Sequence, residues 1–461
     1  MALCYDGLLD AEYDMTYAFR LNASAVSLSL FIAGCATPPV PPAQVGGSVT
    51  QEHRTEPGAL PDQQAFQSWL ADFRAEAARK GISEPTLVAS LDSITPTPRV
   101  VELDRKQPEF TQTFWKYLVS AVSEARVRDG SARLKENRDL LARLEAKYGV
   151  PGRVLVAFWG LETNYGRNIG SFKVPTALAT LAFDGRRSTF FRTELFDALT
   201  IIDRGHIAID KMVGSWAGAI GQTQFMPSTF LRHAVDESGD GRIDVWEQTT
   251  DALGSGANYL KNLGWDSKRS WGREVRLPQN FDLTLASLDS GAAETLKPLN
   301  AWALLGITRA DGQPLPKQDV SAALILPSGR NGPAFLVYDN FRIILKWNRS
   351  ISYALAIGLL SDRISGAPVL VAVRNSDDPL SRDQVVQLQA TLKKFGHLKA
   401  EPDGTLGSVT RRALRQYQAA CKLPADGYAD QKTVAFLAVA SEQGIPCAGQ
   451  NQGVALRDAR Q

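Results

Sequence analysis

One segment limits the possible folds of this chain more than any other: residues 151–166, with the sequence PGRVLVAFWGLETNYG. Residues 154–161 are apolar except for Gly160, so a helix formed here must be buried on all its sides. Pro151 suits the first turn of such a helix, and Gly166 suits its end. The chain must therefore pack other elements around this helix.

Helical spacing of apolar residues continues on both sides of this segment. Residues 66–81 have this spacing, and residues 131–148 repeat it, with Gly149 placed to end the second helix. Strand-like runs are few, and the best candidates are residues 322–326 and 335–338. We therefore predict a mainly α fold, in which a large helical body carries minor β additions.

Composition and charge exclude several classes of protein. The 461 residues allow two or three domains, at roughly 150 residues for each domain. A hydrophobic fraction of 44% and a charged fraction of 22% are ordinary globular values, which argues against a disordered chain and against a membrane protein. The 51 basic and 49 acidic side chains give a net charge of +2. This charge is too small to predict a positively charged surface that attracts nucleic acid.

The N-terminal region has the pattern of a secretion leader. Residues 23–34 are apolar or small, but the stretch is shorter than the roughly 20 residues that a helix needs to span a bilayer. It ends in the sequence IAGC, which resembles the lipobox of bacterial lipoproteins, so Cys35 would be the lipidated residue. Because a Pro- and Gly-rich tether follows at residues 36–62, we favour this interpretation over a buried thiol.

The start of the leader and its destination are two further expectations. Residues 1–14 carry four acidic side chains, whereas a signal peptide should begin with positive charge. We therefore interpret Met15 as the true start, with Arg20 supplying positive charge in a leader that ends at Cys35. Since Ala36 is not an aspartate, a lipoprotein of this kind is expected to be periplasmic and anchored to the outer membrane.

A small helical module is predicted at the C-terminus. Residues 371–382 are polar and predict a linker, residues 383–440 form the module, and residues 441–461 are a tail. The module contains two Asp-Gly turns, and a threonine that could cap a helix follows each Asp by seven residues. Apolar positions on single helix faces predict three short helices. The turns, threonines and apolar positions are Asp403-Gly404, Asp426-Gly427, Thr410, Thr433, Val385, Leu388, Leu392, Phe395, Leu414, Tyr417 and Cys421.

Glu162 is the candidate catalytic residue. It lies near the C-terminal end of the apolar helix, where desolvation and the negative end of the helix dipole both disfavour a charged carboxylate. We expect its pKa to be raised, as is needed for an acid that protonates a glycosidic oxygen. The helix alone leaves an alternative open, a glutamate at the helix rim that is paired with an arginine such as Arg167.

Several motifs carry a family resemblance. The sequences FWGLETNYGRNIG, FDGRRSTFF and GSWAGAIGQTQFMPSTF follow one another in the middle of the chain, with FTQTFWKYL before them and YDNFRIILKWNRSISYALAIGLLSDRI after them. Over roughly residues 66–364 the chain resembles the lytic murein transglycosylase B family, the membrane-bound lytic transglycosylases. The resemblance implies a lysozyme-like core within residues 63–370 that needs no catalytic cofactor.

The resemblance also implies the reaction. The family cleaves the β-1,4 bond between N-acetylmuramic acid and N-acetylglucosamine of peptidoglycan and leaves 1,6-anhydromuramic acid ends. Glu162 would act alone, because the muramic acid 6-hydroxyl serves as the nucleophile, whereas glycosidases that use water usually need two carboxylates. Two rival interpretations are a muramidase that adds water and a non-catalytic lipoprotein that only binds the wall.

The same resemblance indicates which residues would bind the substrate. Polar residues would contact sugar and acetamido groups, two arginines would line the cleft and could meet peptide carboxylates, and tyrosines would form aromatic walls. In that order, these residues are Ser215 and Gln224, then Arg186 and Arg187, then Tyr117, Tyr259 and Tyr338.

Residues 236–247, with the sequence DESGDGRIDVWE, are close to the calcium loop of an EF-hand. Helical stretches flank the loop, so we expect a structural calcium ion, and an acidic turn without an ion is the alternative. A regular loop would close with Glu247, whereas the resemblance implies closure by Asp251, in a loop that is one residue longer than usual. The remaining candidate ligands are Asp236, Ser238, Asp240 and the carbonyl of Arg242.

The C-terminal module resembles the peptidoglycan-binding type 1 domain over nearly its full length, so peptidoglycan strands are its expected partner. The four cysteines of the chain, Cys4, Cys35, Cys421 and Cys447, are too few and too scattered for a zinc cluster or a disulfide framework. Cys421 and Cys447 flank the last helix of the module and could pair in an oxidising compartment, or could stay free thiols.

Overall fold

The computed structural model describes residues 62–106, 112–288, 295–374 and 378–447 of the chain. The predicted leader, the lipobox at Cys35 and most of the tether therefore lie outside the described residues. In the part of the chain that is described, no helix is both long enough and apolar enough to cross a membrane.

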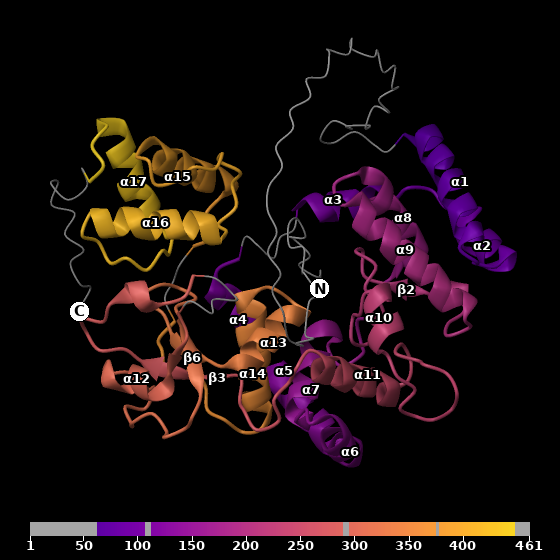
Figure 1. Ribbon diagram of the computed structural model, residues 1–461, viewed down its shortest axis with the longest axis horizontal. Helices are drawn as coiled ribbons and strands as arrows, with labels where there is room; N and C mark the ends of the chain where they lie inside the picture. The colour runs from indigo at the N-terminus through magenta and orange to yellow at the C-terminus, as the bar shows by residue number, and fades with distance from the viewer. Residues whose placement is uncertain (1–61, 107–111, 289–294, 375–377, 448–461) are drawn as a thin grey trace, which may run out of the picture. The chain divides into compact units, whose positions relative to one another are not determined.

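Helices make up most of the catalytic body, as Figure 1 shows, and the prediction of a mainly α fold is confirmed. The described part of the body also contains short 3-10 helices at Ile209–Lys211 and Leu283–Leu285. The α-helices are α1 Gln63–Arg79, α2 Glu84–Leu91, α3 Pro98–Lys106, α4 Phe114–Ala121, α5 Glu124–Glu136, α6 Arg138–Tyr148, α7 Gly152–Thr163, α8 Val174–Asp184, α9 Ser188–Asp203, α10 Pro227–His233, α11 Thr249–Asn262, α12 Leu299–Leu304, α13 Asp339–Trp347 and α14 Ile351–Ile364.

Helix α7 is the apolar helix that the sequence predicts, and it is surrounded by other helices. Every residue of α7 except Arg153 is buried. Helices α5, α6, α11 and α14 pack against it, and they can be followed around it in Figure 1. Packing on all sides removes the apolar side chains of α7 from water, which stabilises the body by roughly 1.5–3 kcal/mol for each large side chain.

One predicted helix is wrong in its extent, because residues 131–148 form parts of two helices rather than one. Helix α5 ends at Asn137, whose side-chain amide donates a hydrogen bond to the carbonyl of Arg133 at 2.9 Å. An asparagine that bonds to its own backbone competes with the helix ladder, so α6 starts afresh at the next residue. Gly149 ends α6 in the left-handed conformation, as predicted.

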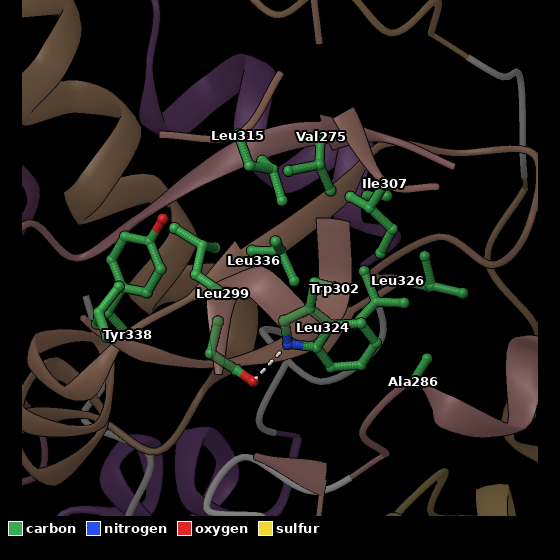
Figure 2. Close-up of a cluster of buried hydrophobic side chains, with 13 residues drawn as sticks. Val275, Ala286, Leu299, Trp302, Ile307, Leu315, Leu324, Leu326, Leu336 and Tyr338 are labelled. Atoms are coloured by element: carbon green, nitrogen blue, oxygen red, sulfur yellow. Dashed lines mark hydrogen bonds between the residues drawn. The ribbon is translucent and has the colours of Figure 1, made fainter. Parts of the chain in front are cut away.

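A five-stranded antiparallel sheet forms the minor β part, in the order β4-β6-β7-β3-β5. Its two longest apolar strands were predicted within one residue of their ends, whereas the other strands are too short or too polar to be recognised. One face packs around Trp302, whose indole N–H donates to the carbonyl of Ala322 at 2.9 Å (Figure 2). The strands of the body are β1 Phe172–Lys173, β2 Val213–Gly214, β3 Gly272–Arg276, β4 Lys297–Pro298, β5 Thr308–Arg309, β6 Ser321–Ile325 and β7 Ala334–Val337.

The C-terminal module consists of the three predicted helices, α15 Arg382–Lys394, α16 Ser408–Ala420 and α17 Gln431–Gln443. The apolar positions that the sequence places on single faces of its first two helices pack together in its core. The predicted threonine caps are wrong by three residues. Gly407 and Asp430 occupy the N-cap positions, and Asp430 accepts a hydrogen bond from the backbone N–H of Thr433.

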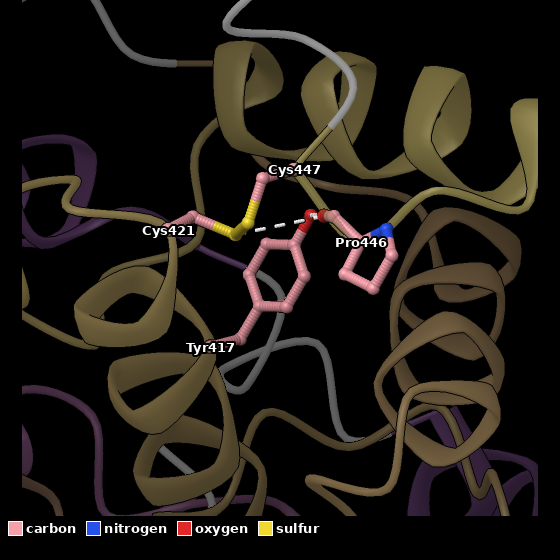
Figure 3. Close-up of a disulfide and its surroundings, with 4 residues drawn as sticks. All are labelled: Tyr417, Cys421, Pro446 and Cys447. Carbon is pink, nitrogen blue, oxygen red and sulfur yellow. Dashed lines mark hydrogen bonds between the residues drawn. A yellow bond between two sulfur atoms is a disulfide. The ribbon is translucent and has the colours of Figure 1, made fainter.

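A disulfide between Cys421 and Cys447 closes the end of the module (Figure 3). The two cysteines lie 26 residues apart in the sequence, and their Cα atoms are 5.4 Å apart. The hydroxyl of Tyr417 donates to the carbonyl of Pro446, which holds the segment before Cys447 against the core. Of the two alternatives that the sequence leaves open, the structure has the paired one.

Removing this disulfide is expected to destabilise the module. Replacing both Cys421 and Cys447 by Ser should cost roughly 2–4 kcal/mol, because the unfolded chain loses a cross-link. The loss is measurable as a lower midpoint for binding of the full chain to purified cell walls in a urea titration. A reducing agent should lower the midpoint of the parent protein and leave the double variant unchanged. A midpoint that is the same in all four samples would contradict this expectation.

Candidate active site

Glu162 lies in the last turn of α7, and the residue is 5% exposed. Two aromatic side chains donate hydrogen bonds to its Oε1 atom. These donors are the indole N–H of Trp347, at 3.0 Å, and the hydroxyl of Tyr353. Arg167, the alternative partner, forms its ion pair with Asp129 instead, at 2.6 Å. Glu162 is therefore a buried acid that no arginine neutralises within the described chain.

Burial raises the pKa of Glu162 from 4.5 to about 7, because the charged form loses its hydration. The hydrogen bonds from Tyr353 and Trp347 act in the opposite direction, because they stabilise the carboxylate. The balance leaves an acid that is largely protonated below pH 7 and can lose its proton near neutrality. Such a group can serve as an acid and then as a base within one reaction.

Replacing Tyr353 by Phe is expected to shift the pH dependence of activity. The variant lacks the hydroxyl that lowers the pKa of Glu162, so this pKa should rise above about 7. The protonated form would then persist to higher pH, and the alkaline limb of the pH–rate profile should move upward by roughly one pH unit. A profile that stays in place, or moves toward lower pH, would show that Tyr353 does not control this acid.

Aromatic rings surround Trp347, and one predicted wall residue is among them. The ring of Trp347 lies 4.4 Å from that of Phe158, 5.4 Å from that of Phe225 and 5.1 Å from that of Tyr259, measured between centroids. Tyr117 lies near enough to Tyr353 to raise the pKa of its hydroxyl further. Tyr259 and Tyr117 are thus adjacent to the two donors of Glu162.

Tyr338 occupies a different place. It belongs to the buried cluster on the sheet, where Figure 2 labels it, and its hydroxyl accepts a hydrogen bond from the guanidinium of Arg273. Among the described residues, no hydrogen bond joins Tyr338 to Glu162 or to the two donors of Glu162. Trp347, at the end of α13, and Tyr353, in α14, take the positions beside the acid.

The backbone directly after Glu162 is held in an unusual conformation. Asn164, Tyr165 and Gly166 all have positive φ values, of 51°, 62° and 80°, which only glycine adopts readily. The Tyr165 hydroxyl donates to the carbonyl of Arg126 at 2.6 Å, and its ring lies against the bare backbone of Gly160. Strain of this kind persists where surrounding contacts enforce it, as is common at active sites.

The loop of residues 214–226 carries the two predicted polar binding residues. Gln224 has a φ of 51° and is buried, and its amide donates to the carbonyls of Ile169 and Gly221. The Oγ atom of Ser215 accepts the backbone N–H of Ala219 at 3.0 Å. This arrangement fixes both side chains and leaves the Gln224 amide oxygen with no described donor.

A direct link joins this loop to the catalytic helix. The hydroxyl of Thr163, the residue after Glu162, donates to the carbonyl of Gln222 at 2.8 Å. The loop that carries Ser215 and Gln224 is thus fastened to the end of α7 next to the acid.

Arg186 and Arg187 both pair with Asp104, a carboxylate that is 1% exposed. Arg186 binds it through its Nε atom at 2.9 Å, and Arg187 also stacks on the ring of Phe191. The sequence gives no signal for Asp104, because nothing distinguishes it from the neighbouring acid of α3, Glu102. The side chain of Arg186 is 42% exposed, so it can still meet an anion, whereas that of Arg187 is 15% exposed.

Several of the predicted calcium ligands make hydrogen bonds or ion pairs within the protein. Within the described ranges, no group of three or more His, Cys, Asp or Glu side chains is placed to hold a metal. Asp251 accepts backbone N–H groups through both oxygens, Asp240 accepts the side-chain amide of Gln248, and Glu247 pairs with Lys211. These carboxylates are committed to N–H donors of the protein itself.

The sequence did not point to Trp347 and Tyr353 individually, although both lie in one of the motifs that carry the family resemblance. The signal that could have found Tyr353 is its place in the apolar helix of residues 351–364, since a buried tyrosine hydroxyl needs a partner. Trp347 is 5% exposed, so its buried indole N–H also needs a hydrogen-bond acceptor.

Comparison with known protein families gives two matches. The model of a family described as Transglycosylase SLT domain matches residues 65–362. A second model, described as Putative peptidoglycan binding domain, matches residues 381–437. The first range contains Glu162 and both of its hydrogen-bond donors.

Individual proteins are similar over most of the same range. Membrane-bound lytic murein transglycosylase B of Escherichia coli (strain K12) is 32% identical over 286 residues, which are 60% of this chain and 74% of that protein. The structure of SltB3 from Pseudomonas aeruginosa in complex with NAG-anhNAM-pentapeptide matches with a TM-score of 0.78 and 44% identity, covering 81% of this chain and 100% of that chain. Escherichia coli Slt35 in complex with calcium matches with a TM-score of 0.54 and 29% identity, covering 66% and 93%.

Proposed function

This chain belongs to the transglycosylase SLT domain family, and from that premise we propose how it cleaves peptidoglycan as a lytic transglycosylase. Glu162 is the acid and then the base of the reaction. The observation that carries this assignment is the burial of its carboxyl group, which raises its pKa to about 7. The reaction needs no cofactor, and a calcium ion in the loop of residues 236–247 would have a structural role, as the calcium complex of Escherichia coli Slt35 suggests.

In the first step the protonated Glu162 gives its proton to the oxygen between N-acetylmuramic acid and N-acetylglucosamine, as the bond to the anomeric carbon breaks. The carboxylate that remains is buried, and a buried charge without partners would be costly. The hydroxyl of Tyr353 and the indole N–H of Trp347 donate to this carboxylate and stabilise it.

In the second step the Glu162 carboxylate takes the proton of the muramic acid 6-hydroxyl. The oxygen of that hydroxyl attacks the anomeric carbon of the same sugar, which closes a 1,6-anhydro ring and returns the acid to its starting state. The described partners of Glu162 are a phenol and an indole rather than a second carboxylate, which supports a mechanism with a single acid. SltB3, the relative from Pseudomonas aeruginosa, has been solved with an anhydro-sugar ligand.

The surrounding side chains bind the glycan in this proposal. Tyr259 and Tyr117, which lie beside Trp347 and Tyr353, offer flat faces to sugar rings. Ser215 and Gln224 hydrogen-bond to acetamido groups. Arg186, held by Asp104, meets a carboxylate of a stem peptide, and Arg187 supports the same cluster from a more buried position. We assign Tyr338 no role in glycan binding, because it lies in the buried cluster on the sheet.

Mass spectrometry of the released fragments tests the transglycosylase reaction against water-using cleavage. Purified cell walls digested by the enzyme should yield muropeptides with anhydro ends, each lighter by one water than a hydrolysed fragment. The C-terminal module is expected to hold the enzyme on these walls, as its family match suggests. Fragments that carry reducing ends throughout would instead identify a muramidase.

We also propose that Cys35 carries a lipid anchor and that the mature protein lies in the periplasm at the outer membrane. The support is the IAGC motif at Cys35 and the Ala36 that follows it. The relative from Escherichia coli is described as membrane-bound. Replacing Cys35 by Ser should move the protein from the membrane fraction to the soluble fraction. Recovery of the parent protein in the inner membrane would contradict the outer-membrane assignment.

A further inference from the structure

We propose that the first Asp-Gly turn of the C-terminal module, at Asp403 and Gly404, binds peptide groups in the stem peptides of peptidoglycan. This inference rests on the wall-binding role proposed for the module, and it adds the residues and the chemistry through which the module would hold the wall. The second Asp-Gly turn, at Asp426 and Gly427, has the same construction and already binds backbone peptide groups.

The two turns share their backbone and side-chain geometry. The glycine of each turn has a positive φ, of 78° at Gly404 and 69° at Gly427. The Oδ1 atom of each aspartate accepts the backbone N–H of the residue two positions later, at 2.8 Å from Thr405 and at 3.0 Å from Tyr428. This Asx-turn pattern uses Oδ1 inside the turn, so the Oδ2 atom is the one that can accept a hydrogen bond from a ligand.

A buried glutamine from the preceding helix holds each turn in place. Gln389 of α15 donates to the Oδ1 atom of Asp403 at 2.7 Å and accepts the backbone N–H of the following glycine at 2.8 Å. Gln418 of α16 donates to the Oδ1 atom of Asp426 at 3.0 Å and accepts the corresponding N–H at 2.7 Å. Both glutamines are buried. Because the contacts of one turn recur in the other, the two aspartates have their Oδ2 atoms in equivalent places.

An arginine lies beside the aspartate carbonyl in each turn. Arg382 donates to the carbonyl of Asp403 at 3.1 Å, and Arg415 donates to that of Asp426 at 3.3 Å. Each turn therefore combines a carboxylate oxygen, which accepts N–H groups, with a guanidinium, which donates to carbonyl oxygens. A peptide backbone offers both of these partners.

The second turn binds backbone groups of this same chain. The Oδ2 atom of Asp426 accepts the backbone N–H of Arg330 at 2.9 Å. The guanidinium of Arg415 donates to the carbonyls of Thr284 and Ala286, at 3.3 Å and 2.7 Å. Arg330, Thr284 and Ala286 all lie outside the module, in the catalytic body. The turn and its arginine thus recognise peptide N–H and C=O groups.

The first turn presents the same groups to solvent. Within the described ranges, no residue donates a hydrogen bond to the Oδ2 atom of Asp403, whose Oδ1 atom has two donors. Asp403 and Arg382 are both exposed. A carboxylate oxygen and a guanidinium are therefore available here to a ligand from outside the chain.

Stem peptides are the ligand class that fits both this site and the family match of the module. Their backbone supplies N–H and C=O groups in succession, like the body segments that the second turn binds, whereas a glycan strand has amides only in the acetyl groups of its sugars. In the bound state Asp403 accepts a peptide N–H and Arg382 donates to a peptide carbonyl. Hydrogen bonds with a charged partner are stronger than those between neutral groups.

Cosedimentation of the full chain with purified cell walls tests the site, with every protein carrying Glu162→Gln so that the walls stay intact. Asp403→Asn keeps the inner oxygen that the turn needs and replaces the outer one by an amide that cannot accept. The affinity for walls should fall by about tenfold, and Arg382→Ala should lower it by about fivefold. Binding by Asp403→Asn that equals that of the parent would overturn the assignment.

Asp426→Asn is the matched control, because it makes the same change in the turn that the body occupies. Its affinity for walls should stay within about twofold of that of the parent. An equal loss of affinity in Asp403→Asn and Asp426→Asn would show that the change acts on the fold of the module, and the assignment of the first turn would then be wrong.

Walls from which an amidase has removed the stem peptides identify the bound group. The affinity of the parent should fall to that of Asp403→Asn, and the two proteins should bind these bare glycan strands equally. A difference of about tenfold that persists on bare glycan would assign the turn to an acetyl group of a sugar and refute the peptide assignment. A parent protein that sediments with neither preparation would refute the wall-binding role of the whole module.

Discussion

Replacing Glu162 by Gln should reduce cell-wall cleavage by about a thousandfold or more. Gln keeps the size of the side chain and can still accept the hydrogen bonds of Tyr353 and Trp347, but it can neither donate a proton to the glycosidic oxygen nor take one back. General acid–base catalysis contributes roughly 10²–10⁴-fold, and here one group serves in both steps. Zymography of the two proteins at equal loading, with a timed assay of soluble fragments, measures the loss.

The stability of the same variant provides a control for correct folding. The pKa of Glu162 is raised from 4.5 in the unfolded chain to about 7 in the fold, so ionisation destabilises the fold above pH 7. This penalty is of the order of 3 kcal/mol, and it disappears as the pH falls toward 4.5. Gln cannot ionise, so Glu162→Gln should unfold at a higher temperature than the parent protein at pH 8, and at a similar temperature at pH 4.5.

Two outcomes would contradict this assignment. Undiminished cleavage by Glu162→Gln would remove the residue from the chemistry. A variant that is inactive and also less stable at pH 8 would show that the loss of activity comes from misfolding rather than from the missing acid.

Replacing Gly160 by Ala is expected to damage the catalytic body, although it adds only one methyl group. A Cβ atom at this position would lie 2.7 Å from three atoms of the Tyr165 phenol, closer than carbon atoms approach in proteins. The ring has little freedom to move, because its hydroxyl is bonded to Arg126 and its backbone is already in the left-handed region. The overpacking should cost roughly 1–3 kcal/mol, and the displaced turn should disturb Glu162 as well.

A matched control for this change lies in α11. A Cβ atom at Gly256 would have only ordinary contacts, the nearest at 3.6 Å to Thr223. Because alanine favours helix by about 1 kcal/mol over glycine, Gly256→Ala should be neutral or slightly stabilising. Thermal unfolding of both variants, together with their cleavage rates, separates a steric effect at Gly160 from a general effect of losing a helical glycine. Equal stability of the two variants would refute the steric argument.

The sequence predicts well what depends on local pattern. Helix α7 and the acid at its end follow from an unbroken apolar run, and strands β6 and β7 follow from short apolar segments. The family resemblance adds Tyr259 and Tyr117, which the structure brings beside the donors of the acid. The apolar spacing gave a wrong prediction at Asn137. The spacing continues through this residue, but the chain forms two helices here, because the Asn137 side chain bonds to the carbonyl of Arg133.

The contacts that tune the acid were beyond sequence reasoning, because they join distant parts of the chain. Trp347 and Tyr353 lie 185 and 191 residues after Glu162, and no periodic pattern in the sequence indicates that residues so far apart are in contact. The same limit applies to Asp104, which reaches Arg186 and Arg187 from another helix. The backbone N–H groups that Asp251 accepts through both oxygens are likewise visible only in the structure.

The long separation in sequence between Glu162 and its two donors affects when, during synthesis of the chain, the active site can be complete. A nascent chain that has been synthesised only as far as α11 contains Glu162 but neither Trp347 nor Tyr353. Neither hydrogen bond that lowers the pKa of Glu162 can form at that stage. Both donors are present only when α13 and α14 have been synthesised and have packed against α7. A copy that ends before α13 therefore lacks both hydrogen bonds that stabilise the ionised acid.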